Sequence, residues 1–160
     1  MAIHRDDIDL VRWFLNHSAS PNLRPNSYMS KTPLSQAVIY SSIDIVRLLV
    51  SRGARVDEGN LLHAISWSDR PGRDDVLAYI LSEGAPLNKL KHEHDPRQFA
   101  IEKLRWGVGT PLHDAVGRRR KWIVVTLLAW GADKAIRDTK GRTPEELGRE
   151  IGATEVLEVF

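Results

Sequence analysis

The 160-residue sequence contains no cysteine, which excludes disulfide bonds, a thiolate nucleophile and a zinc site built on cysteine. It has no marked surplus of one charge, because 23 basic and 21 acidic residues leave a net charge of +2. It lacks an apolar run of about 18 residues, and no basic segment precedes an apolar stretch at its N-terminus. These absences lead us to expect an intracellular protein, cytoplasmic or nuclear, with no signal peptide and no contact with a membrane.

The composition that remains is typical of a folded protein. Apolar residues make up 42% of the chain and charged residues 28%. A disordered chain would have fewer apolar residues and a larger net charge. At this length we expect a single domain, spanning residues 1–160.

One apolar pattern recurs along the chain: two adjacent apolar residues, then two more one helical turn later. This spacing places all four residues on one face of an α-helix and therefore predicts an amphipathic helix at each occurrence. The five stripes are Leu10, Val11, Phe14 and Leu15; Ile45, Val46, Leu49 and Val50; Val76, Leu77, Ile80 and Leu81; Ile123, Val124, Leu127 and Leu128; and Val156, Leu157 and Phe160.

Each stripe has its own boundary signals. Glycine follows the middle three at Gly53, Gly84 and Gly131, where it suits a left-handed helix C-cap, and Ser18 takes that place in the first. Upstream lies a second signature, with Thr or Asn as the expected helix cap and Pro tolerated at the first helical position. It reads TPLSQA at 32–37, NLLHAI at 60–65, TPLHDA at 110–115 and TPEELG at 143–148. Such short helices are stable only when stacked on neighbours.

TPLHDA and the sequence that follows it resemble the ankyrin repeat family, and Thr110 to Thr143 gives that family's period of 33. The resemblance implies an all-α solenoid of stacked helix-turn-helix units with loop or hairpin connections and one inserted short helix. The units are 1–31, 32–59, 60–88, 110–142 and 143–160, with an insertion at 89–109. The first and last units are truncated, which favours a fragment of a longer array over a small protein with minimal caps.

The insertion contains DPRQFAIEKLRWG, in which Asp95 is the expected N-cap, Pro96 the first helical residue and Gly107 the terminator. We expect a short helix across the loop face. Insertions in repeat arrays often lie on the binding face, but a neutral surface elaboration accounts for the sequence equally well.

Four consecutive basic residues, Arg118 to Lys121, fall at the turn between two helices of one unit. Nucleic-acid binding would require similar patches on successive repeats, and the corresponding turns are acidic or neutral. We therefore interpret the run as a solvated turn or a rim contact.

Histidines raise the question of catalysis or metal binding. By resemblance, His63 and His113 in the TPLH motif fasten adjacent repeats. HEHD at 92–95 is a possible metal site, but residues two apart share a face only on a strand, and no third ligand follows from spacing. An enzyme would have to use His92, His94, Asp95 and Asp69, which form no recognisable catalytic arrangement. We expect no catalytic residue, no metal and no other cofactor.

By resemblance, ankyrin arrays bind another protein with loop tips and the exposed ends of their first helices. This chain is expected to be a monomeric protein-binding module, or a regulatory segment of a larger protein. Tyr, Trp and Arg are enriched in interface hot spots, which favours Tyr40, Trp67 and Arg118 on successive repeats. The helix-end positions are His4, Arg5, Ile39, Tyr40, Trp67, Ser68, Gly117, Arg118, Glu150 and Ile151. The loop positions are Tyr28, Met29, Lys31, Trp106 and Arg142.

Other residues receive narrower predictions. Trp13 is expected in the core, and Trp122 and Trp130 are expected to cap the outer surface. An alternative for Trp67 is that the insertion covers it. Asn22 and Asn88 match the loop asparagine that is hydroxylated in some ankyrin proteins.

Overall fold

The computed structural model describes residues 2–24, 31–93, 95–105 and 107–160. Within these ranges every regular element is a helix and no strand is present, as the sequence predicts. The chain divides into two compact units, Met1–Ala85 and Pro86–Phe160. Because the placement of one unit against the other is not determined, each is described by itself.

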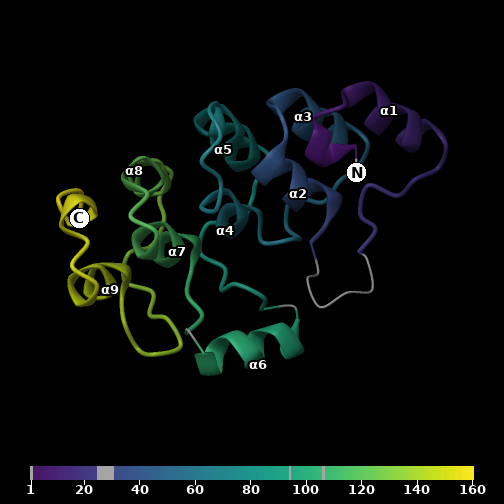
Figure 1. The fold of residues 1–160 in the computed structure, drawn as a ribbon. Coiled ribbons are helices and arrows are strands. Elements are labelled where there is room, and N and C mark those ends of the chain that lie inside the picture. The colour runs from purple at the N-terminus through teal and green to yellow at the C-terminus, as the bar shows by residue number, and fades with distance from the viewer. Residues whose placement is uncertain (1, 25–30, 94, 106) are drawn as a thin grey trace. The chain divides into compact units, whose positions relative to one another are not determined.

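The first unit contains two layers of helices (Figure 1). Helix α2 contacts η1 and α4 in one layer, and α3 contacts α1 and α5 in the other. The apolar stripes meet between the layers, where Ile45, Leu49, Leu77 and Ile80 are fully buried. The elements are η1 (Ile3–Arg5), α1 (Ile8–Asn16), α2 (Pro33–Tyr40), α3 (Ile43–Ser51), α4 (Leu61–Ile65) and α5 (Arg73–Ser82).

The second unit repeats this arrangement. Helix α7 packs on α9, α8 packs on α10, and Leu112, Ile123 and Leu127 are fully buried among them. Figure 1 shows α6 apart from both of these layers. The elements are α6 (Pro96–Arg105), α7 (Pro111–Gly117), α8 (Lys121–Ala129), α9 (Pro144–Glu150) and α10 (Thr154–Leu157).

The predicted helix starts are confirmed at threonine and wrong at asparagine. The Thr32 hydroxyl accepts a hydrogen bond from the Ser35 N–H at 3.1 Å, and Thr143 accepts one from the Glu146 N–H at 3.2 Å. Asn60 has a left-handed backbone with φ of 51° and makes no side-chain cap bond. A cap residue needs extended backbone to aim its side chain at the first turn, so Asn60 cannot act as one.

The predicted helix ends are confirmed. Gly53, Gly84 and Gly131 have φ of 84°, 86° and 88°. A Cβ is strained in this left-handed region, which explains the glycines. Ser18, which replaces glycine in the first repeat, has φ of 67° and performs the same turn.

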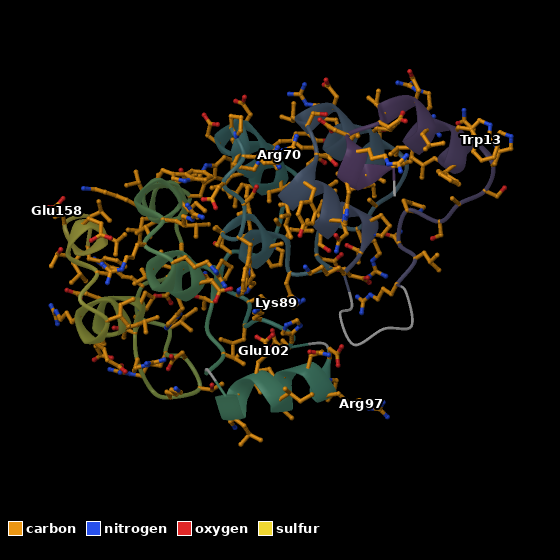
Figure 2. All side chains as sticks on the ribbon, in the orientation of Figure 1. Trp13, Arg70, Lys89, Arg97, Glu102 and Glu158 are labelled. Atoms are coloured by element: carbon orange, nitrogen blue, oxygen red, sulfur yellow. The ribbon has the colours of Figure 1, made fainter. Side chains whose placement is uncertain are left out.

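Trp13 is not in the core, which corrects the prediction for this residue. Its side chain is 52% exposed and stacks on His17, with ring centroids 4.0 Å apart. The equivalent residue of α3 is Leu48, which is half-buried, and α3 has a helix on each side. Figure 2 shows Trp13 on the outer part of α1, away from α3.

The inserted helix forms where the sequence predicts it. Asp95 accepts a hydrogen bond from the Gln98 N–H at 3.2 Å, Pro96 is the first helical residue, and Gly107 follows with φ of 81°. Hydrogen bonds hold the base of the insertion, since the Lys91 N–H donates to the Gly109 carbonyl at 3.1 Å.

Candidate interaction surfaces

In the first unit, three rings stand at the ends of stacked helices. The His4 and Tyr40 rings lie 4.5 Å apart, and the exposed Trp67 follows directly after α4. Tyr40 is 36% exposed and Trp67 55%. We call His4, Tyr40 and Trp67 the aromatic row.

Hydrogen bonds between repeats hold the backbone beneath the aromatic row. The Ser41 hydroxyl donates to the Ile3 carbonyl at 2.7 Å, and the Ser68 hydroxyl donates to the Ile39 carbonyl at the same distance. Both serines are buried, so these bonds are shielded from water. The repeats themselves therefore hold the backbone that carries the row.

Ile39, predicted as a partner-binding residue, is buried at 6% exposure, and its exposure at a helix end was wrongly predicted. One step along a helix rotates a side chain by about 100°. This rotation places Ile39 on the side of the buried Ser35 and Tyr40 on the side of the half-buried Gln36. We therefore leave Ile39 out of the surface.

The basic run of the second unit binds the neighbouring repeat. Arg119 donates to the Ile151 carbonyl at 2.9 Å and the Gly152 carbonyl at 3.2 Å, just after α9. Lys121 pairs with Glu158 at 2.6 Å. Burial lowers the pKa of the half-buried Arg118, and the charge of Asp114 acts in the opposite direction. Two of the four residues of the run, Arg119 and Lys121, therefore join neighbouring repeats.

Arg142, predicted as a partner contact, supports its own loop. Its side chain pairs with Asp138 at 2.7 Å and with Glu150 at 2.8 Å. Burial alone would raise the pKa of Asp138, but hydrogen bonds from Arg142 and Lys140 bring it below its usual value. The Arg142 guanidinium is thus occupied within the second unit.

The remaining predicted positions are only partly described. Tyr28, Met29 and Trp106 lie outside the described residues, as does His94 of the HEHD segment. Lys31 is half-buried, and Gly117 and Glu150 are exposed at their helix ends.

The candidate metal and catalytic residues of the insertion have other partners. His92 Nε2 lies 3.1 Å from Glu102, and Lys91 lies 2.9 Å from the same carboxylate. Hydrogen bonding from His92 is the main cause that lowers the pKa of Glu102 to about 2. Figure 2 shows Glu102 on the side of α6 that faces this loop and Arg97 on another side. The described residues contain no group of three or more potential metal ligands.

The motif histidines are buried, in agreement with a structural role. His63 is 4% exposed and His113 3%. The Thr110 N–H donates to His113 Nδ1 at 3.1 Å, and His113 Nε2 lies 2.9 Å from the Arg142 carbonyl. His113 therefore joins the start of α7 to the loop before α9.

The two loop asparagines bridge consecutive loops. Asn22 donates to the Gly53 carbonyl at 2.8 Å and accepts from the Arg55 N–H at 2.9 Å. Asn88 accepts from the Asp133 N–H at 2.9 Å. Asp133 is equivalent to Arg55, because each lies two residues after the glycine that ends a helix. Asn88 thus repeats in the second unit the accepting half of the Asn22 bridge.

Replacing Asn22 with alanine should lower the free energy of unfolding of the first unit by about 1 kcal/mol, because two partly exposed hydrogen bonds are lost. Urea denaturation would measure the change. The matched variant Asn22→Asp keeps the acceptor and loses the donor, so we expect a loss at least as large, since the carboxylate faces the Gly53 carbonyl. A wild-type stability in Asn22→Ala would contradict the bridging role.

Comparison with known proteins agrees with the repeat spacing. A family model described as ankyrin repeats (3 copies) matches residues 1–60. The chain is 32% identical over 111 residues to Palmitoyltransferase Hip14 of Drosophila melanogaster, covering 66% of this chain and 15% of that protein. It is 28% identical over 116 residues to Transient receptor potential cation channel subfamily A member 1 of the same organism, covering 66% and 9%.

A third relative matches over most of both chains. Putative ankyrin repeat protein FPV230 of Fowlpox virus (strain NVSL) is 29% identical over 164 residues, covering 89% of this chain and 87% of that protein. The chain therefore spans a small part of the two Drosophila relatives and most of the viral one. Among the described residues, no helix combines the length and apolarity needed to cross a membrane.

Proposed function

We propose, from the premise that this chain belongs to the ankyrin-repeat family, that it binds a partner protein at the aromatic row of its first unit. Ankyrin repeats are generally protein-interaction modules. The observation that carries the proposal is the exposure of Tyr40 and Trp67 at matching ends of stacked helices.

The physical argument concerns rigidity. Large aromatic side chains bury much apolar area and have few rotatable bonds, so they lose little conformational entropy on binding. The Ser41 and Ser68 hydrogen bonds fix the backbone at both helix ends. A partner that covers Tyr40 and Trp67 would therefore gain apolar burial without ordering a loop.

Charged groups at the edge of the row supply a polar rim. Arg5 and Arg70 are exposed, and Arg70 lies 3.8 Å from Asp6. Rim charges influence association rate and partner choice more than affinity. The proposed function is thus binding without catalysis, at a site with apolar anchors and an edge of mixed charge, since Asp7 and Asp69 are exposed beside the two arginines.

A second candidate places the partner in the same polypeptide. The similar regions of the two Drosophila relatives make up 15% and 9% of those proteins, so there the repeats are part of a much larger chain. By analogy, the aromatic row would contact another domain of the same polypeptide. The repeats would then act as a regulatory segment. Binding of purified flanking domains to the aromatic row would favour this candidate.

The experiment compares affinity capture by the wild type, by Tyr40→Ala/Trp67→Ala and by Trp13→Ala. Each hot-spot side chain contributes about 2 kcal/mol or more, so the double variant should lose at least about 100-fold in affinity. Trp13→Ala removes an exposed tryptophan of the same unit that lies outside the row, and it should retain the partner. Thermal melts of the three proteins should match within a few degrees.

A partner retained equally by the double variant and the wild type would overturn the proposed site. If Trp13→Ala loses the partner while the double variant keeps it, the binding surface lies on α1. Salt titration of the captured complex would then report how much the rim charges contribute to the affinity.

A further inference from the structure

The inserted helix α6 leaves one side uncovered. Arg97, Ala100, Ile101 and Leu104 share this side, because residues three, four and seven positions apart lie on one face of a helix. All four are exposed, Leu104 to 86% and Ile101 to 44%. We call these four residues the α6 face.

The opposite side of α6 holds the helix to its own unit. Glu102 pairs with Lys91 at 2.9 Å and with His92 at 3.1 Å, and Phe99 is half-buried. Figure 2 shows Glu102 facing this loop and Arg97 on another side of the helix. Glu102 is the only acid in α6, so the one negative charge of the helix is turned away from the α6 face and is already paired.

The insertion carries the net positive charge of the chain. Residues 89–109 contain five basic and three acidic residues, and outside this segment the two kinds are equal in number. Arg97 and Lys103 are exposed and form no ion pair with another residue that the structure describes. Of the acids, Glu93 is exposed before the helix, whereas Asp95 is half-buried and caps it.

A further lysine lies at the C-terminal end of α6. Lys140 is exposed, and its stem lies against Gly107, where an added Cβ would be 3.2 Å from the Lys140 Cγ. This lysine also forms no ion pair within the described part of the chain. Uncompensated positive charge therefore accompanies the exposed aliphatic residues along the helix.

The shape and composition of the α6 face suit a lipid surface better than a protein. Figure 1 shows α6 apart from the helix layers, and a leucine exposed as fully as Leu104 stands on a ridge. A protein partner would need a groove that matches this ridge, whereas lipids conform to it. Leucine is also under-represented among protein hot spots, while aliphatic residues beside lysine and arginine are typical of interfacial helices.

We propose that the α6 face binds the surface of an anionic membrane. Ile101 and Leu104 enter the boundary between headgroups and acyl chains, and Arg97 and Lys103 pair with the anionic headgroups. The ten residues of α6 span about 15 Å, half of a hydrocarbon core, so the helix lies on the membrane and does not cross it.

This inference goes beyond the proposed function, because the aromatic row lies in the first unit and α6 in the second. It also differs from the expectation, drawn from the sequence, of no contact with a membrane. Two aliphatic side chains bury less apolar area than one acyl chain, which itself gives only marginal binding. We therefore expect reversible binding that requires anionic lipid and weakens as salt screens the basic residues.

Co-sedimentation with vesicles tests the apolar part of the proposal. At low salt the wild type should sediment with vesicles of equal parts phosphatidylserine and phosphatidylcholine, and not with phosphatidylcholine alone. Leu104→Ser should lower the partition coefficient about 10-fold, because its side chain no longer enters the apolar boundary. The matched variant Leu23→Ser replaces a 66% exposed leucine of the first unit and should bind as the wild type does.

Charge variants test the electrostatic part. Arg97→Glu/Lys103→Glu should lower the partition coefficient by at least about 30-fold. Arg5→Glu/Arg12→Glu changes the net charge equally at exposed residues of the first unit, and it should retain most of the binding. Tyr40→Ala/Trp67→Ala should bind vesicles as the wild type does, which separates this test from that of the aromatic row.

A fluorescent label tests the orientation, because the chain has no cysteine of its own. An environment-sensitive fluorophore on Leu104→Cys should brighten on phosphatidylserine vesicles, while the same label on Arg12→Cys should not. A wild type that stays in solution with these vesicles would overturn the proposal, even if the α6 face then proved to bind an acidic protein. Equal sedimentation of Leu104→Ser and Leu23→Ser, or of the two charge variants, would also overturn it.

Discussion

Replacing Arg73 with alanine should lower the free energy of unfolding of the first unit by about 3 kcal/mol. Arg73 is the first residue of α5, yet its side chain is buried, with 4% of the residue exposed. It donates hydrogen bonds to the Val38 carbonyl at 2.7 Å and to the Ser41 carbonyl at 2.5 Å. Both acceptors lie at the end of α2.

The expected size of the effect follows from the acceptors. The last carbonyls of a helix have no partner within the helix and carry partial negative charge. In Arg73→Ala the carbonyls of Val38 and Ser41 would stay buried without their donor. Burial, and to a lesser degree Arg70, lowers the pKa of Arg73, which reflects how far its guanidinium is removed from water.

Urea denaturation of wild type, Arg73→Ala, Arg73→Met and Arg70→Ala would check the prediction. Arg73→Met restores much of the packing but no donor, so it should recover only part of the loss. Arg70 is exposed and close to Asp6, and Arg70→Ala should cost less than about 0.5 kcal/mol. If Arg73→Ala and Arg70→Ala prove equally stable, the Arg73 hydrogen bonds do not support α2.

Local features of the fold were predictable because their causes are local. The stripe Ile45, Val46, Leu49 and Val50 identifies a helix from spacing alone, and Gly53 marks its end because the backbone there requires positive φ. The inserted helix was equally predictable from Asp95 and Pro96. In each case the deciding interaction spans only a few residues.

Long-range contacts explain what the sequence could not show. Arg73 follows a Pro-Gly turn that looks solvent-exposed, and its acceptor Val38 is 35 positions away. Arg119 belongs to a basic run that reads as a solvated turn, and only the structure places it on the carbonyl of Ile151. Which side chains stay exposed was equally hidden, because Trp13 was expected in the core from its position next to a stripe, and that position does not show how much of it a neighbouring helix covers.

For the candidate surfaces, comparison of equivalent positions is the most informative sequence signal. The exposure of Tyr40 and Trp67 could be predicted from their place at helix ends. Ile39, one position before Tyr40, faces the core instead. Trp122 was predicted only to cap the outer surface. Its contrast with Asp44 and Asp75 emerges when the repeats are aligned on the stripes, and the structure adds that this position is solvent-facing.

Protonation of His113 should destabilise the second unit, so stability should fall as the pH drops below about 6.5. The Thr110 N–H can only donate, so Nδ1 holds the lone pair and Nε2–H donates to the Arg142 carbonyl. Burial lowers the pKa of His113, opposed by the Arg142 hydrogen bond and by Asp138. The unfolded state therefore binds a proton first, and the stability present above pH 6.5 is lost as the pH falls towards the lower folded value.

Two measurements check this prediction. Nitrogen-detected titration of the imidazole should show the neutral Nε2–H tautomer at pH 7 and a midpoint below 6.5. His113→Gln cannot titrate, so its free energy of unfolding should be lower by about 2–3 kcal/mol at pH 7 and should change less between pH 7 and 5. A midpoint at or above 6.5 would contradict the assignment, because it would mean that the folded unit accepts the charged ring. The carboxylates are separable from this effect, since Asp138 and Glu102 have pKa values below their usual range and protonate only at lower pH.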